Sequence, residues 1–254
     1  MKHIPNIFTL LNLFFGCLAL VFVLQTESYN ITSYQDGTSS FNLPEKIALA
    51  SIFIFLAAAV DFLDGFVARL FKASSELGKQ LDSLADVVSF GVAPGAILYQ
   101  LLRASYMQQP NGLYVPILYL LPAFVYSCAG AYRLAKFNVD TSQANGFKGV
   151  PIPACGLLIA SFPLIISGGN NVVNELLVSK WFLYTLIIIL SALMISNLPL
   201  MALKFKNVSL KDNLPKYLIT AIALTTALIF QWVAVPIVFV TYLILSLIFK
   251  NKLI

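Results

Sequence analysis

The stretch IALASIFIFLAAAVDFLDGFVARLF, residues 47–71, is almost entirely apolar up to Val60 and then carries Asp61, Asp64 and Arg69. A helix needs about 20 predominantly apolar residues to cross the hydrocarbon core of a bilayer, and this stretch is long enough. An acid at the bilayer centre costs roughly 2.5–3.5 kcal/mol on insertion scales, so such acids face a bundle interior or a wet cavity. The stretch therefore predicts a transmembrane helix that ends in a polar site.

The composition of the whole chain agrees with this prediction. Of 254 residues, 59% are hydrophobic and only 11% are charged, and the mean hydropathy is +0.86. A soluble domain carries about 25% charged residues. These values exclude a soluble enzyme, a DNA-binding domain and a disordered chain. The net charge of +5 is then a feature of membrane topology, and we expect no nucleic-acid partner.

Further apolar segments accompany this one, and their boundaries define the predicted fold. The first has one lysine before it and no small-residue cleavage site after it, so we expect a retained helix and not a signal peptide. The last two are separated by a short turn at residues 232–236 and predict a tight hairpin. We predict an all-α, polytopic transmembrane bundle of about eight spans, the others being residues 7–24, 81–102, 114–137, 150–167, 181–203, 217–231 and 235–249.

The basic residues indicate how this bundle is oriented, since cytoplasmic loops are enriched in Lys and Arg. With the N-terminus inside, the outer side receives only Lys46, Arg103 and Lys180. We therefore expect both termini at the cytoplasmic face. The inner side receives Lys2, Arg69, Lys72, Lys79, Arg133, Lys136, Lys148, Lys204, Lys206, Lys211, Lys216, Lys250 and Lys252.

Four acids lie at the inner ends of two neighbouring predicted helices. Asp61 and Asp64 are three residues apart and Asp82 and Asp86 are four apart, so each pair shares one helix face. If the faces meet, like charges about 4 Å apart repel by about 4 kcal/mol at an effective dielectric of 20. Divalent cations relieve this repulsion and give the cluster a chemistry. The alternatives are acids that pack helices or relay protons.

Small and basic residues surround these acids. Gly65 and Ala68 leave the helix open to a bulky ligand, and Gly78 opens the approach to the next helix. Arg69 supplies a planar fork of donors that suits a phosphate. Acids for metal, small residues for access and an arginine for phosphate together indicate a metal-assisted phosphoryl-transfer site.

The pattern Asp61-x2-Asp64-Gly65-x2-Ala68-Arg69-x8-Gly78-x3-Asp82-x3-Asp86 matches the signature of the CDP-alcohol phosphotransferases at every fixed position. This resemblance implies transfer of a phosphatidyl or related group from a CDP-linked donor to an alcohol, with release of CMP. It also implies two divalent cations, Mg or Mn, a homodimer and a bacterial inner membrane. The family core has six helices, which implies a catalytic domain at residues 1–203 and an added basic linker and hairpin at 204–254.

Within this family the chain is most similar to the integral-membrane phosphatidylserine synthases, which implies CDP-diacylglycerol and L-serine as substrates. Lys136, Val150 and Ile152 stand where arginine, leucine and threonine are usual. The alternatives are another acceptor alcohol, glycerol 3-phosphate or inositol phosphate, and more distantly an ion or proton transporter. The similarity extends over about residues 1–158 and is carried by residues 4–12, 81–94, 132–138 and 147–153.

The resemblance also implies roles for individual residues. Asp61, Asp64 and Asp82 would hold one metal ion, and Asp61, Asp82 and Asp86 a second. Asp86 would also be the general base that takes the proton of the attacking hydroxyl. The residues expected to bind CDP-diacylglycerol are Gly65, Ala68, Arg69, Ser75, Gly78, Asn6, Thr9 and Asn12, and those expected to bind serine or phosphate are Arg133, Lys136 and Asn138.

Simpler roles remain open for several of these residues. Ser75 would also suit an ordinary loop position or the cap of a helix. Asn6, Thr9 and Asn12 would also serve as hydrogen-bonding groups between membrane helices. Lys136 suits an anchor at the lipid head groups.

Overall fold

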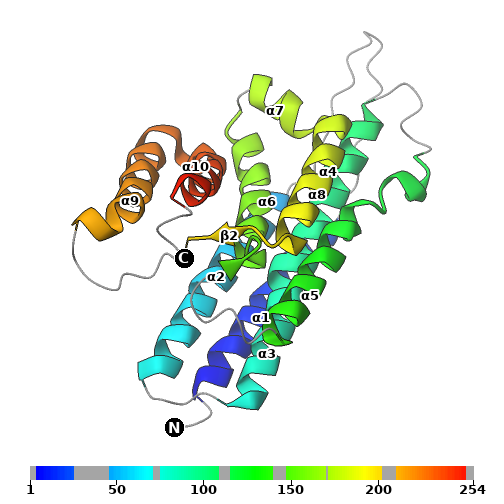
Figure 1. Cartoon of the computed structure of the whole chain (residues 1–254). Helices are drawn as coiled ribbons and strands as arrows, with labels where there is room; N and C mark the ends of the chain where they lie inside the picture. Colours follow the sequence, from blue (N-terminus) through cyan, green and yellow to red (C-terminus); the bar gives the residue numbers. More distant parts are fainter. Residues whose placement is uncertain are drawn as a thin grey trace, which may run out of the picture.

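The computed structural model describes residues 4–25, 46–70, 75–108, 115–139, 147–169, 171–201 and 210–249, and this part of the chain is almost entirely helical (Figure 1). The α-helices are α1 Ile4–Leu24, α2 Ile47–Leu70, α3 Glu76–Asp86, α4 Ala93–Met107, α5 Ala123–Val139, α6 Ile152–Ser167, α7 Asn171–Leu177, α8 Lys180–Ile195, α9 Leu210–Phe230 and α10 Ala234–Ile248. The shorter elements are η1 Val87–Val92, η3 Ile117–Tyr119, η5 Gln231–Val233, β1 Phe147–Lys148 and β2 Pro199–Leu200.

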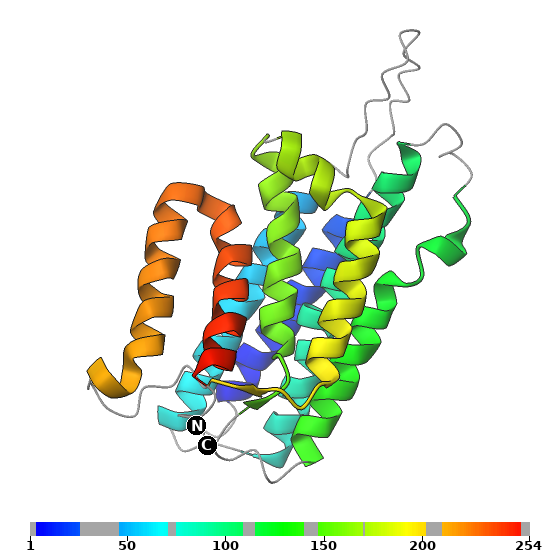
Figure 2. The ribbon, with the colours of Figure 1, turned by 45° about the horizontal axis from the view of Figure 1, so that its top comes forward.

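The long helices run side by side as a bundle, and α7 lies across one end of it (Figures 1 and 2). The opposite end holds the beginning of α1, the end of α2 and the beginning of α3 (Figure 2). The two short strands pair antiparallel with Phe147 opposite Leu200. The elements that carry the predicted acids are thus gathered at one end of the bundle.

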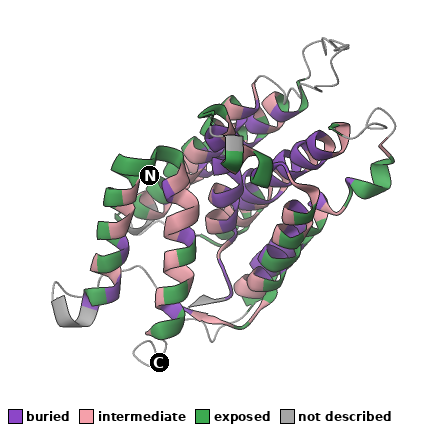
Figure 3. Ribbon diagram, turned by 90° about the horizontal axis from the view of Figure 1, so that it is seen from above, coloured by how far each residue is buried: buried purple, intermediate pink, exposed green. Residues whose placement is uncertain are grey.

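The helices have the length and composition of membrane spans. Residues 6–24, 47–67, 76–107 and 213–248 form apolar helical stretches long enough to cross a bilayer, and α6 and α8 are shorter apolar helices. Buried residues gather between the helices (Figure 3), while Trp181 and Leu228 are largely exposed. Large exposed apolar side chains suit a surface that faces lipid. The predicted all-α, multi-pass membrane bundle is confirmed at this level.

The stretch 213–248 is not one straight helix. At η5 the chain turns back, with Gln231 at a φ of 49°, and α9 and α10 lie antiparallel beside the bundle (Figures 1 and 2). The ring of Trp232 in this turn packs 5.4 Å from the ring of Phe55 on α2. The C-terminal hairpin thus has the predicted form, and α10 is its inner helix.

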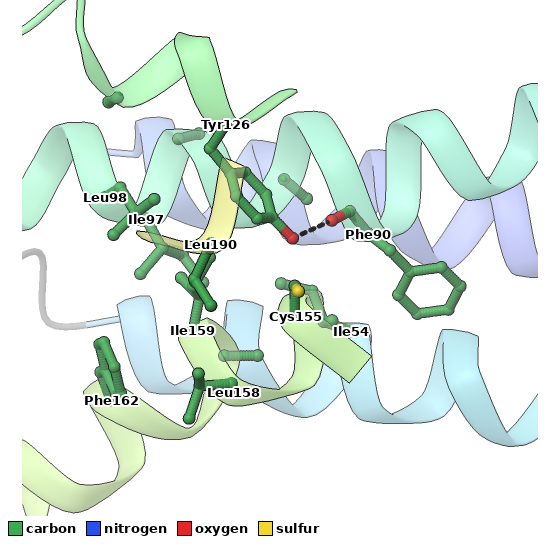
Figure 4. Packing of buried hydrophobic residues seen from close by; sticks show 14 of the residues in the cluster. Ile54, Phe90, Ile97, Leu98, Tyr126, Cys155, Leu158, Ile159, Phe162 and Leu190 are labelled. Atoms are coloured by element: carbon green, nitrogen blue, oxygen red, sulfur yellow. Dashed lines mark hydrogen bonds between the residues drawn. The ribbon is translucent and has the colours of Figure 1, made fainter. Parts of the chain in front are cut away.

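A π-helix, which has wider turns than an α-helix, lies in the centre of the bundle. Val87–Val92 is a π-helix between α3 and α4. Tyr126 on α5 donates a hydrogen bond to the carbonyl of Phe90 over 2.7 Å, among Ile97, Cys155 and Ile159 (Figure 4). Ser127 donates to the carbonyl of Gly91 over 2.8 Å. Single π-turns are rare in proteins, but those that occur are often found at functional sites. This one directly follows Asp86.

The structure corrects several expected boundaries. The helix expected from residue 114 begins at Ala123, because Pro122 favours the start of a helix over its interior. The helix expected to reach residue 203 ends at Ile195, where Ser196 is extended and Pro199 begins β2. The last-but-one helix begins at Leu210 and not at residue 217.

Two elements were not expected at all. The strands β1 and β2 are a small exception to the all-α prediction, and α7 lies between the predicted spans 150–167 and 181–203, where no helix was predicted. The strands are too short for a periodic pattern, since each contains two residues. Asn174 of α7 donates a hydrogen bond to the carbonyl of Ile166, so this helix is held by a tertiary contact.

We predict that Gly149→Ala strongly destabilises the protein. Gly149 has a φ of +76°, and an added Cβ would lie 2.5 Å from the carbonyl oxygen of Met194. The left-handed backbone costs about 1–2 kcal/mol for alanine and the clash about 1–3 kcal/mol more. Gly169→Ala is the matched control, because Gly169 has a φ of +80° and nothing within 4 Å. Thermal unfolding in detergent should show a clearly larger loss for Gly149→Ala, and equal losses would contradict this account.

Candidate active site

Carboxylates from two helices converge at the end of the bundle that holds the start of α1. One carboxylate oxygen from each of Asp61, Asp64 and Asp82 lies within 4.8 Å of the other two. Asp61 and Asp64 come from the last turns of α2, and Asp82 comes from α3. Oxygen ligands at this spacing are what a hard divalent cation requires. The predicted convergence of these three acids is confirmed, and their geometry fits a metal ion.

The acids point inward because the end of α2 is amphipathic. Phe62 and Phe66, on the same turns, are 70% and 52% exposed, whereas Asp64 is only 8% exposed. The aromatic side chains thus face outward and the carboxylates face the bundle. In a bilayer, a helix that carries both aromatic side chains and acids turns the aromatic ones toward lipid and the acids toward the bundle.

Helix α1 supplies polar groups to the carboxylates. Thr9 donates a hydrogen bond to Asp64 Oδ2 over 2.8 Å, and Asn12 Nδ2 donates to Asp86 Oδ1 over 3.3 Å. Ser89 in the π-helix donates to the backbone carbonyl of Asn12 over 3.0 Å. Thr9 and Asn12 therefore hold the acids in place, which agrees with the interhelical role left open for them.

A glycine permits this close approach of α1 to the π-helix. A Cβ added to Gly16 would lie 2.4 Å from Ser89 Oγ and 2.9 Å from Ser89 Cα. Only glycine lets the two backbones approach this closely. Ser89 and Gly16 were not among the predicted site residues. The signal for Ser89 is its place three residues after Asp86, on the same helix face.

Asp86 differs from the other three acids in its surroundings. It is 7% exposed and lies where α3 passes into the π-helix. Its carboxyl group interacts electrostatically with those of Asp61 and Asp82. Asn12 Oδ1 beside it is buried without a hydrogen-bond partner. A buried polar atom without a partner costs free energy, so this position suits a bound ligand, ion or water.

Arg133 is the second unusual group of this region. Its side chain on α5 is 7% exposed, and its Nε has no hydrogen-bond partner within the described ranges. The ring of Phe137 lies 5.1 Å from its Cζ, and its charge interacts with that of Asp86. An unpaired charge is expensive to bury. A guanidinium in this state is ready to bind an anion with a planar pair of oxygens.

The remaining predicted residues have local partners in the structure. Ser75 Oγ accepts a hydrogen bond from the backbone N–H of Gly78 over 3.0 Å, so Ser75 caps α3. Asn6 lies beside Gly78, where an added Cβ would be 3.1 Å from Asn6 Oδ1. Gly65 lies on α2 between the carboxylates and the end of the helix. The side chains of Ala68 and Arg69 are outside the described residues.

The predicted cationic end of α5 is tied to its neighbours. Lys136 Nζ donates a hydrogen bond to Asn197 Oδ1 over 2.8 Å. Asn138 Nδ2 donates to Ser83 Oγ over 2.7 Å, and Lys79 Nζ donates to the carbonyl of Asn138 over 3.4 Å. Asn138 thus joins α5 to α3 next to the carboxylates, and Lys136 joins α5 to the segment before β2.

The fold and the site define a multi-pass membrane protein with a carboxylate cluster that can hold a metal ion at one end of its bundle. Residues 2–194 match the model of the CDP-alcohol phosphatidyltransferase family. The chain belongs to this family, as the resemblance of its aspartate pattern implied.

Several relatives of the chain carry the name CDP-diacylglycerol–serine O-phosphatidyltransferase. The chain is similar to the CDP-diacylglycerol–serine O-phosphatidyltransferase of Bacillus subtilis strain 168. The identity is 36% over 185 residues, which cover 71% of this chain and 89% of the relative. The enzyme of that name from Helicobacter pylori strain 26695 is 31% identical over 246 residues, 96% of this chain and 89% of the relative. The Saccharomyces cerevisiae enzyme of that name is 33% identical over 176 residues, 66% of this chain and 55% of the relative.

We predict that Thr9→Val weakens the binding of Mn²⁺ to the purified protein by about tenfold. The substitution removes the hydroxyl that orients Asp64, and loss of such a supporting hydrogen bond typically costs 10–100-fold in metal affinity. Thr9→Ser should keep near-normal affinity. Thr220→Val is the matched control, because the Thr220 hydroxyl only bonds within α9. Electron paramagnetic resonance of free Mn²⁺ measures the affinity, and unchanged binding in Thr9→Val would refute the role of this hydroxyl.

Proposed function

We propose that this chain transfers the phosphatidyl group of CDP-diacylglycerol to the hydroxyl of L-serine, giving phosphatidylserine and CMP. The observation that carries the reaction class is the partly buried carboxylate cluster on α2 and α3, in a chain of the CDP-alcohol phosphatidyltransferase family. The choice of serine rests on the names of the relatives, which cover most of this chain. The chain is thus a membrane-bound transferase of phospholipid biosynthesis.

The carboxylates are proposed to hold two divalent cations, Mg or Mn. Asp61, Asp64 and Asp82 would ligate one, and Asp61, Asp82 and Asp86 the second. When bound, such ions neutralise the pyrophosphate of the donor and the charge that develops on the leaving CMP. The spacing of the first three acids supports the first site, and the interaction of Asp86 with Asp61 and Asp82 supports the second.

Asp86 is proposed to be the general base. The serine hydroxyl oxygen forms a bond to the phosphorus of the phosphatidyl group, the bond from that phosphorus to the CMP oxygen breaks, and Asp86 receives the hydroxyl proton. A serine hydroxyl is a weak nucleophile without such a base. Asn12 supports this role, because its hydrogen bond fixes one oxygen of the Asp86 carboxylate.

Arg133 is proposed to bind the carboxylate of the incoming serine or a phosphate of the donor. Its burial, the absence of a partner for Nε within the described residues and its interaction with Asp86 all support an anion site next to the base. Asn138 and Lys136 would support this site from the end of α5. The residues proposed to contact the CDP part of the donor are Gly65, Ala68, Arg69, Ser75, Gly78 and Asn6.

The proposed arrangement in the membrane has eight spans. The alternating direction of α1, α2, α3–α4, α5, α6, α8, α9 and α10 supports it (Figure 2). The distribution of lysine and arginine supports a cytoplasmic location for both termini and the active site. Residues 1–203 would form the catalytic domain and residues 204–254 the linker and hairpin. The protein would act in a bacterial inner membrane as a homodimer.

The acceptor is tested by competition. Purified protein in detergent, with Mn²⁺ and labelled CDP-diacylglycerol, should release CMP when L-serine is added and not with glycerol 3-phosphate or inositol phosphate. Release with one of the other alcohols would assign the chain to a sister phosphatidyltransferase. A transporter that uses its acids as a proton relay would release no CMP under any of these conditions.

We predict that Asp86→Asn separates donor binding from turnover. Asparagine keeps an oxygen ligand of similar size but loses the charge and the base. The variant should bind CDP-diacylglycerol with metal about tenfold more weakly, and should turn over at least about a hundredfold more slowly, the lower end of what a general base contributes. Calorimetry of donor binding and CMP release on one preparation measure both.

The other acids provide the comparison for this variant. Asn at Asp61, Asp64 or Asp82 should weaken metal dependence and donor binding together, because these residues only ligate. Near-normal turnover in Asp86→Asn would remove its role as a base. Complete loss of donor binding would make Asp86 a metal ligand only.

A further inference from the structure

Aromatic side chains and one lysine gather at the end of the bundle away from the carboxylates. Tyr106 follows Asp86 by 20 residues on the helical stretch Glu76–Met107. A helix rises by about 1.5 Å per residue, so Tyr106 lies about 30 Å further along the helix axis than Asp86. This distance matches the hydrocarbon core of a bilayer. With the carboxylates at one face of the membrane, Tyr106 therefore lies at the other.

Three tyrosines from three elements are joined at this end. The hydroxyl oxygens of Tyr106 on α4 and Tyr184 on α8 are 2.9 Å apart, and Tyr184 donates to the backbone carbonyl of Tyr119 in η3 over 2.6 Å. The rings of Tyr106 and Tyr119 stack with their centroids 5.6 Å apart. Because the one proton of Tyr184 goes to Tyr119, Tyr106 donates to Tyr184. Both hydroxyl protons are thus engaged, and the contacts fix the rings relative to one another.

Lys180, the first residue of α8, lies against these rings. Its Nζ is 5.1 Å from the centroid of the Tyr106 ring and 5.9 Å from that of the Trp181 ring. In the described part of the chain, no carboxylate and no hydrogen-bond acceptor pairs with this ammonium group. Contact with aromatic ring faces attracts a cation but leaves its N–H donors unused. The charge of Lys180 is therefore held in place and open to an anion.

The surroundings of Lys180 suit contact with lipid. Trp181 is 73% exposed, and Ile188, two turns further along the same face of α8, is 68% exposed. Ile117 and Leu118 of η3 are also more than half exposed. Exposed apolar surface of this kind marks a membrane contact, and tryptophan and tyrosine gather at the level of the head groups. Lysine at this level extends its ammonium toward the polar layer.

We propose that Lys180 and the aromatic side chains around it bind the phosphate of an anionic phospholipid, at the membrane face opposite the carboxylates. The ammonium supplies a point charge for the phosphate, while Trp181 and η3 contact the adjoining part of the lipid. A choline head group is disfavoured, because Lys180 already occupies the ring faces that would attract its cation. This lipid site is separate from the proposed transfer reaction and does not depend on the identity of the acceptor.

Tryptophan fluorescence tests the proposal on the full-length chain, which has two tryptophans. Trp232→Phe keeps an aromatic ring against Phe55 and leaves Trp181 as the only tryptophan. In nanodiscs, a low mole fraction of brominated phosphatidylglycerol should quench Trp181 about fivefold more strongly than the same fraction of brominated phosphatidylcholine, the preference that one lysine provides near a membrane surface. Equal quenching by the two lipids, or none by either, would overturn the proposal.

Two lysine variants in the Trp232→Phe background assign this preference to the site. Lys180→Gln should abolish it. Lys46→Gln is the matched control, because Lys46 directly precedes α2 at the same end of the bundle, and it should keep the preference. A preference that persists in Lys180→Gln, or that falls equally in both variants, would contradict a site at Lys180.

Salt provides a second measurement that needs no change at Lys180. High salt screens a charge at the membrane surface, so it should reduce the preference for phosphatidylglycerol in the Trp232→Phe protein. If Lys180→Gln does not fold, this measurement decides, and a preference that high salt leaves unchanged would overturn the proposal.

Discussion

This structure depends on one constraint. Several carboxylates must lie within an apolar bundle without being exposed to lipid. An acid that faces lipid is costly, and several acids that face one another repel. The helix ends that carry Asp61, Asp64 and Asp82 can therefore meet only if polar groups, protons or cations compensate the charges. Helix α1 supplies Thr9 and Asn12 for this purpose, and the spacing of the acids leaves room for a metal ion.

The close packing around the site follows from this constraint. Asn12 reaches Asp86 because Gly16 lets α1 approach Ser89. The π-helix after Asp86 places two carbonyls where Tyr126 and Ser127 of α5 donate to them. These contacts join α1, α3 and α5 directly behind the carboxylates. Rigid packing of this kind holds catalytic groups in place more precisely than loops do.

The polar groups left without partners are as informative as the paired ones. Arg133 Nε and Asn12 Oδ1 are two of the few buried side-chain atoms in the described residues without a hydrogen bond, and both residues interact with Asp86. Buried polar groups are normally satisfied, so such atoms at one place indicate where a ligand completes the structure. This agrees with the proposed acceptor site, which includes both Asp86 and Arg133.

The sequence by itself determined the bundle and the reaction class, because both depend on local patterns. Apolar length predicts spans, and the spacing from Asp61 to Asp86 places the acids on two helix faces. The roles of Thr9, Asn12 and Ser75 stayed open, since a polar residue on a helix serves equally well as a cap, a ligand or an interhelical bond. The structure assigned Ser75 to the cap of α3, a contact only three residues along the chain, and only the tertiary fold brought Thr9 to Asp64. The tertiary fold also brought Asn12 to Asp86, because residues 74 positions apart meet only through the packing of whole helices.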